Sequence, residues 1–536
     1  MVSPFRGSEK GLGPQATEAI IDRLTSDIPL KNLFVIPKKY VCLNLEQSGF
    51  SCDSTPDPTT SRLLATQLRA DEYLEGTVTK SANGYKLDAR MVLTRDNTMV
   101  QPLPPVEGKK MGDLAHQISK ELQEARKQLP DERQCELAIA NGKPQEAIAA
   151  AQAAVAAYPQ STIGRVCLAN AYLATKAPPD SIIAVTAKVI ELDPHNRPAL
   201  ALAADAYKAK YDQTKDTVAL NKAVDTWAAM LAADPKNVKL VTDVTEKIAA
   251  SGQAARAKPI IQQAVQDNPG DPSLIHLYWL ILQATKDYHM ATEVGEQMTR
   301  VDTSAADTSF FLRQAALYAL DSQPQKAAET TARGVAKFPN NASLWSLNSQ
   351  MQRVAGQTQQ AVASADKAIQ LNPKLGDAYL RKAQAEVDLN QPDSAVAALR
   401  GALANGGDSA TIGQFVLALG SKAYKAADSI KPPQIEPYQH AISILAYADS
   451  ISPTPAGKFV LGVAAFKVGD IAVRQNQTAK QCELAQTAQD AFATAQVNVA
   501  AGGRTDPQTA QQILGVLSQY TPAVESQLKR FCKSTK

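Results

Sequence analysis

Six cysteines are the residues of this chain whose spacing most directly indicates chemistry. They form three local groups of two: Cys42 with Cys52, Cys135 with Cys167, and Cys482 with Cys532. An even number of cysteines with local spacing predicts disulfides, and therefore an oxidising compartment. The alternative is six buried thiols in a cytosolic protein, because free cysteine is often a small apolar core residue. No Cys-x-x-Cys and no nearby histidine cluster accompanies them, so we expect no metal site.

The common catalytic signatures are missing from the sequence. HExxH, GxSxG and GxxxxGK[ST], which mark many zinc enzymes, hydrolases and P-loop proteins, do not occur. The five histidines are dispersed along the chain, at positions His116, His195, His276, His289 and His440. We therefore expect a protein that is not an enzyme and needs no cofactor.

Charge and hydropathy narrow the possible partners and the compartment. Lys plus Arg number 56 and Asp plus Glu number 53, and the basic residues are scattered along the chain. Because nucleic-acid binders usually carry a clustered basic face, we expect no nucleic-acid partner. No apolar run of about 18 residues occurs, so we expect no transmembrane segment. Residues 1–13 show no signal-peptide core. Because the cysteines favour an oxidising compartment, we expect a periplasmic or envelope-associated bacterial protein whose leader was removed, with a cytoplasmic protein as the alternative.

A sequence repeat dominates the rest of the chain. Prolines that end predicted helices recur at a nearly constant interval, which is doubled once, at Pro159, Pro194, Pro235, Pro269, Pro339 and Pro373. An alanine stands twelve residues before most of these helix ends or before the stops that lack proline: Ala147, Ala223, Ala257, Ala291, Ala327, Ala361, Ala395 and Ala441. Such a period predicts stacked helical hairpins, since one hairpin cannot bury its own apolar face. A small side chain at a fixed position lets the paired helix approach closely.

This pattern resembles the tetratricopeptide repeat, a helix–turn–helix unit of about 34 residues. The resemblance implies a mostly α-helical solenoid of about nine repeats over 128–455, followed by a divergent repeat and capping helices over 456–536. The unit at 197–237 carries about seven extra residues and the unit at 410–455 is longer still. We expect both insertions to form loops. Glu525, Lys529, Arg530, Lys533 and Lys536 make the final helix charged enough to cap the stack.

The resemblance also implies a partner-binding groove lined by the first helix of each repeat. Counting along the repeats predicts a polar strip of mixed sign on this face, formed by Asp205, Lys208, Glu246, His276, Gln283, Gln350, Arg353, Gln384 and Asp388. For each single residue, a solvated helix face is an equally good interpretation. The extended concave surface of a solenoid makes the strip as a whole a binding hypothesis.

Residues 1–110 have a different character. Strand-like runs at 32–37, 72–80 and 85–94 alternate with helical stretches, and Asn83-Gly84 between the last two predicts a tight hairpin. The order of elements resembles the α/β domain found at the amino terminus of TolB, which implies protein contacts rather than catalysis. A connecting helix over 111–127 is expected to lead from this small α/β domain into the solenoid.

The sequence as a whole predicts a non-enzymatic scaffold that binds a protein or peptide segment in the solenoid groove. The alternative is a structural protein that self-associates end to end, because stacks with heterologous ends can form filaments or lattices.

Overall fold

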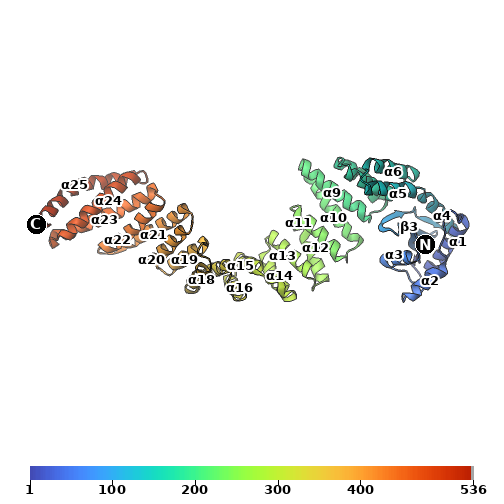
Figure 1. Ribbon diagram of the computed structural model, residues 1–536, viewed down its shortest axis with the longest axis horizontal. Coiled ribbons are helices and arrows are strands. Elements are labelled where there is room, and N and C mark those ends of the chain that lie inside the picture. Colours follow the sequence, from blue (N-terminus) through green and yellow to red (C-terminus); the bar gives the residue numbers. More distant parts are fainter. Residues whose placement is uncertain (533–536) are drawn as a thin grey trace. The chain divides into compact units, whose positions relative to one another are not determined.

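The computed structural model describes residues 1–532 of the 536-residue chain (Figure 1). Two compact units divide it, Met1–Thr285 and Lys286–Lys536. The first contains a small sheet and helices α1 to α13, and the second contains helices α14 to α25. The architecture is a helical solenoid of the tetratricopeptide-repeat type that follows a small N-terminal sheet.

The N-terminal sheet is built around one long hairpin. Its strands are β1 (Arg6–Gly7), β2 (Glu72–Ser81), β3 (Gly84–Leu93), β4 (Asp96–Pro102) and β5 (Val106–Gly108). β1 is parallel to β2, β2 and β3 are antiparallel, and both β4 and β5 pair with β3. The predicted hairpin exists, but its loop residues are Ala82 and Asn83, since Ser81 pairs with Gly84. Gly84 itself has φ +125°, and a side chain there would meet the Gly108 carbonyl oxygen.

The strand predicted at 32–37 is wrong. This segment has no sheet partner and leads into helix α2 (Lys38–Gln47), which the sequence reading missed. The reason lies in the sheet: residues 2–7 occupy one edge of β2 and β3 occupies the other. No edge of β2 is therefore left for the 32–37 segment.

Helices cover both faces of the sheet. α1 (Leu12–Asp27) and α4 (Met111–Arg126) pack on one face, and α2 and α3 (Pro58–Gln67) on part of the other. The first core is continuous with side chains of the solenoid, among them Tyr158, Ile163 and Val189. A buried amide network reinforces the junction, since Gln101 Oε1 accepts hydrogen bonds from Thr162 N at 2.9 Å and from Gln128 Nε2 at 3.1 Å. The sheet and the first repeats thus share one core.

Helices α5 to α22 follow in helix–turn–helix order. In the first unit they are α5 (Leu129–Ala140), α6 (Pro144–Ala157), α7 (Ile163–Ala174), α8 (Pro179–Leu192), α9 (Arg197–Thr214), α10 (Thr217–Ala233), α11 (Val238–Ala250), α12 (Ala254–Asp267) and α13 (Pro272–Ala284). In the second they are α14 (Tyr288–Val301), α15 (Thr308–Leu320), α16 (Pro324–Lys337), α17 (Ala342–Val354), α18 (Thr358–Leu371), α19 (Gly376–Asp388), α20 (Pro392–Ala404), α21 (Ser409–Ser429) and α22 (Ile435–Ile451), with a single 3₁₀ turn at Thr303–Ala305. All eight alanines of the repeat pattern are at most 1% exposed, which is what close approach of paired helices requires.

The two insertions lengthen helices instead of forming loops, so that expectation was wrong. α9 and α10 have 18 and 17 residues, and α21 and α22 have 21 and 17, whereas α19 and α20 have 13 each. The inserted residues in α9 and α21 stay helical, because helical backbone satisfies its own N–H and C=O groups. The longer pairs therefore project beyond the turns of their neighbours.

Three long helices complete the described chain: α23 (Pro455–Ala479), α24 (Cys482–Gly502) and α25 (Pro507–Phe531). Glu525, Lys529 and Arg530 lie in α25, while Lys533 and Lys536 lie outside the described residues. No helix of residues 1–532 is long and apolar enough to span a membrane.

All six cysteines form disulfides, in the three local pairs. Cys42–Cys52 joins α2 to the loop behind it, Cys135–Cys167 joins α5 to α7, and Cys482–Cys532 joins the start of α24 to the end of α25. The disulfide prediction is confirmed, and the alternative of buried free thiols is not.

Candidate functional site

The first helices of successive pairs form the inner face of the stack within each unit. α15 packs on α17 and α17 on α19, and likewise α5 packs on α7 and α11 on α13, whereas successive second helices approach each other less closely. In a curved array neighbours are closest on the inside, so the first helices line the concave side that such solenoids use for binding.

Arg381 is the centre of the polar face on α17 and α19. From α19 its Nε donates to Ser346 Oγ of α17 at 3.1 Å, its Nη1 donates to Gln350 Oε1, and its Nη2 pairs with Asp377 Oδ2 at 3.3 Å. Burial lowers the pKa of Arg381, and the Asp377 carboxylate opposes this effect. The side chain is 21% exposed, so the guanidinium is fixed in place yet reaches the surface.

A second link joins the same two helices one turn further on. Arg353 Nη1 of α17 donates to Asp388 Oδ2 of α19 at 3.0 Å. Arg353 Nε is buried without a hydrogen-bond partner among the described residues. The positions 346 and 381, and likewise 353 and 388, are 35 residues apart, one more than the 34 residues that separate the starts of α17 and α19. Each link therefore joins a residue of α17 to the residue that follows its equivalent in α19, and we call Ser346, Gln350, Arg353, Asp377, Arg381 and Asp388 the polar row.

The first unit has a comparable link between α9 and α11. Lys247 Nζ lies 2.9 Å from Asp205 Oδ1, and Trp227 Nε1 of α10 donates to the same oxygen at 3.1 Å. Lys247 also lies 5.8 Å from the centre of the Trp227 ring. Asp205 and Lys247 are 42 residues apart, one more than the 41 residues that separate the starts of α9 and α11, which is the same offset as in the polar row.

The other predicted strip residues are not brought together. Lys208 pairs with Asp212 of its own helix, Gln283 donates to the Trp279 carbonyl of its own helix, and the exposed His276 ring lies 6.1 Å from the Trp279 ring. Two further candidates, Glu246 and Gln384, are exposed and partly exposed. The nine predicted residues are divided between the two units, and only Asp205 and the group of Gln350, Arg353 and Asp388 take part in contacts between repeats.

Sequence reasoning missed Arg381 and Lys247, which hold these contacts. Arg381 lies 35 residues after Ser346 and one turn before the predicted Gln384. Counting one 34-residue repeat on from Ser346 leads to Leu380, so the repeat alone does not find Arg381. Lys247 directly follows Glu246, which is the residue that counting one lengthened repeat on from Asp205 reaches.

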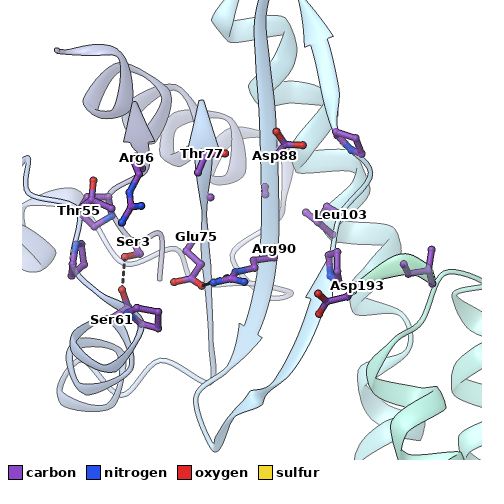
Figure 2. Close-up of a pocket in the computed structure, with 18 of the residues that line it drawn as sticks. Ser3, Arg6, Thr55, Ser61, Glu75, Thr77, Asp88, Arg90, Leu103 and Asp193 are labelled. Carbon is purple, nitrogen blue, oxygen red and sulfur yellow. Dashed lines mark hydrogen bonds and ion pairs between the residues drawn. The ribbon is translucent and has the colours of Figure 1, made fainter. Parts of the chain in front are cut away.

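A separate cleft of about 580 Å³ lies in the first unit, between the second face of the sheet and the α8–α9 turn. Figure 2 shows the Glu75–Arg90 pair on β2 and β3 at its centre, Arg6 beside Thr55 at one side and Asp193 at the other. Glu75 is 14% exposed and 2.7 Å from Arg90. Six of the lining residues are prolines, at positions Pro4, Pro56, Pro58, Pro102, Pro105 and Pro194. Since proline fixes φ, these walls are rigid.

Neither region assembles a nucleophile or a metal site. The Ser3 and Ser61 hydroxyls in the cleft hydrogen-bond each other at 3.2 Å, and no histidine lines it. A serine without a neighbouring base is a weak nucleophile. Over residues 1–532 no group of three His, Cys, Asp or Glu side chains is placed to hold a metal ion. The chemistry on offer is hydrogen bonding and ion pairing.

Comparison with known proteins agrees with this architecture. Residues 134–197 and 350–410 match the family model for the tetratricopeptide repeat. The chain contains tetratricopeptide repeats. The second match includes the polar row from Gln350 to Asp388, and this repeat is one that proteins use for protein–protein interaction. The resemblance of residues 1–110 to a TolB-type domain is not confirmed.

Several solved structures are similar to parts of the chain. YrrB, described as a tetratricopeptide-repeat protein with an unusual peptide-binding site, is 12% identical with a TM-score of 0.29, over 34% of this chain and 93% of that one. MamA from Desulfovibrio magneticus RS-1 is 16% identical with a TM-score of 0.28, over 31% and 93%. Naa15/Naa10 bound to HypK-THB is 10% identical with a TM-score of 0.43, over 76% and 69%. The search of curated proteins found no match.

Proposed function

We propose that this tetratricopeptide-repeat protein is a non-enzymatic scaffold that holds a segment of a partner protein on the inner face of α17 and α19. The partner would lie across the polar row in an extended or helical conformation. The N-terminal sheet and its cleft would supply a second contact surface.

The observation that carries this proposal is the fixed geometry of Arg381 and Arg353. A guanidinium has five N–H donors, and Arg381 uses three of them within the protein and Arg353 one. Since Arg353 Nε is buried, the donors left for a partner are the remaining Nη N–H groups of these two partly exposed side chains, whose internal hydrogen bonds limit their motion. Because less entropy is then lost on binding, a preorganised donor binds an acceptor more tightly than a mobile one. Backbone carbonyls and side-chain oxygens of a partner segment are suitable acceptors.

We place the scaffold outside the cytoplasm, in a bacterial envelope or periplasm. Three disulfides support this, because cytosolic reductants keep most thiols reduced. The absence of a catalytic constellation in the two regions described supports a role that is not enzymatic.

Site-specific photocrosslinking in the full-length chain tests the proposal. A photoreactive residue at Gln384, on the first helix α19, should capture a partner from native extracts, whereas one at exposed Gln370, on the second helix α18, should not. Arg353→Glu in the Gln384 background should reduce the captured amount, since it places a carboxylate opposite Asp388. Equal capture from both positions, or capture that Arg353→Glu leaves unchanged, would count against the inner face as the binding surface.

A further inference from the structure

An apolar pocket of about 210 Å³ lies beside the end of the polar row in the second unit. α21 contributes Leu419, Ala423 and Ala426, Ile430 follows at its C-terminal end, and Val387 of α19 forms the facing wall. The α21 positions recur every three to four residues, so they share one side of the helix. Val387 precedes Asp388 of the polar row, which makes the pocket continuous with that face.

The pocket is a consequence of the lengthened helix pair. α19 ends at Asp388 and α20 begins at Pro392, whereas α21 continues to Ser429. α21 has 21 residues against 13 in each of α19 and α20, so its last turns extend beyond the length of the shorter pair. On the apolar side of this overhang the shorter pair contributes only its end, with Val387, Asn390 and Pro392 lining the pocket. Thus Ala426 is exposed and Ala423 half-buried, although Ala427 beside them is 1% exposed.

The charged side chains at the rim of the pocket differ in whether they already have an ion-pair partner. His440 Nε2 lies 2.6 Å from Asp393 Oδ1 of α20, so this acid is already partnered. Lys422 lies on α21 at the rim, is exposed, and has no ion-pair partner among residues 1–532. The rim therefore offers one available cation beside an apolar hollow.

We infer that this pocket receives one large aliphatic side chain of the partner segment, with an acidic residue next to it in the partner's sequence. The inference rests on the proposed function and deepens it by stating the chemistry of the partner. An apolar cavity of about 150 Å³ can hold a benzene ring, so the present volume suffices for a leucine, isoleucine or methionine side chain. Single apolar anchors in pockets commonly dominate the binding energy of an interface. Lys422 would pair with the neighbouring carboxylate of the partner.

Three capped tripeptides test the pocket directly on the full-length protein, without knowledge of the partner. They are N-acetyl-Asp-Leu-Asp amide, N-acetyl-Asp-Ala-Asp amide and N-acetyl-Lys-Leu-Lys amide, and their binding is measured by ligand-observed NMR titration. We expect the first to bind with a Kd of about 1 mM. Loss of the leucine side chain should weaken binding at least about tenfold, and reversal of the flanking charge about two- to fivefold.

Variants locate the binding. Ala426→Leu fills the pocket from an exposed position and should abolish binding of the Asp-Leu-Asp peptide, whereas Ala363→Leu, on the exposed side of α18, should leave it unchanged. Lys422→Gln should remove the preference for the acidic peptide over the basic one. Circular dichroism and the unfolding midpoint verify that each variant is folded.

Two results would overturn the inference: no binding of the Asp-Leu-Asp peptide at about 10 mM, or equal binding by wild type and Ala426→Leu. Either result leaves the photocrosslinking at Gln384 unaffected, so failure of the pocket is distinguishable from failure of the scaffold function.

Discussion

Removal of the Cys135–Cys167 disulfide should destabilise the first unit by an amount that follows from its loop length. The cross-link joins α5 to α7 over a separation of 32 residues, and both cysteines are at most 2% exposed. A cross-link restricts the unfolded chain, and the loop-closure relation gives about 3.7 kcal/mol for this separation. The same relation gives about 2.7 kcal/mol for Cys42–Cys52, with a separation of 10 residues.

The assay is urea unfolding of Cys135→Ala/Cys167→Ala in a Trp345→Phe background. Trp227 and Trp279, both 3% exposed, then report on the first unit alone. With unchanged slope, the shift of the midpoint gives the change in unfolding free energy. Cys42→Ala/Cys52→Ala is the matched control and should shift the midpoint less.

An unchanged midpoint for the first double variant would refute the reasoning, because it would mean that the purified chain carries no such cross-link. A larger loss for the 42–52 pair than for the 135–167 pair would refute the loop-entropy account. The first of these results would also remove the main support for an extracytoplasmic location.

Two further predictions concern the second unit. Gly469→Ala should destabilise it by about 1–3 kcal/mol, because a Cβ at Gly469 would lie 2.3 Å from the Phe492 ring of α24. Gly515→Ala on α25, where nothing lies within 4 Å, should stabilise by up to about 1 kcal/mol; thermal unfolding compares the two, and equal shifts would contradict the packing argument. Glu296→Gln should reduce the loss of stability in acid: burial raises the pKa of Glu296, but Arg333, at 2.7 Å, together with Gln314 and Tyr318, holds it below its ordinary 4.5. A carboxylate with a lowered pKa stabilises the fold above its ordinary pKa and loses that contribution as the pH falls through its pKa in the folded protein. On acidification the wild type should therefore lose about 0.5 kcal/mol more unfolding free energy than the variant. The control Glu329→Gln, on the exposed surface of α16, should behave as wild type.

The repeat itself could be predicted from the sequence because it depends on local and periodic signals. A small residue stands at the same place in most hairpins, with Ile182 of α8 as the exception, and all eight alanines of that pattern are buried. Likewise the paired cysteines are 10, 32 and 50 residues apart and no other cysteine lies between the members of a pair, so their grouping along the sequence was enough to indicate the three disulfides.

Only the tertiary structure decided the features that depend on what neighbours leave open. The 32–37 segment has the composition of a strand, but β2 already pairs on both edges. The residues of a segment do not show whether the edge of another strand is free to pair with it. From the sequence, the inserted residues of α9 and α21 could form either loops or longer helices. The apolar pocket exists only because α21 is longer than α19 and α20. Arg381 acquires its place in the polar row from two residues of the preceding repeat, Ser346 and Gln350, whose distance in sequence is bridged by stacking. The periodicity of the sequence thus determined the helices and their buried faces. Unequal helix lengths and contacts between repeats determined the surfaces that could bind a partner, because those surfaces depend on where one helix ends relative to the next.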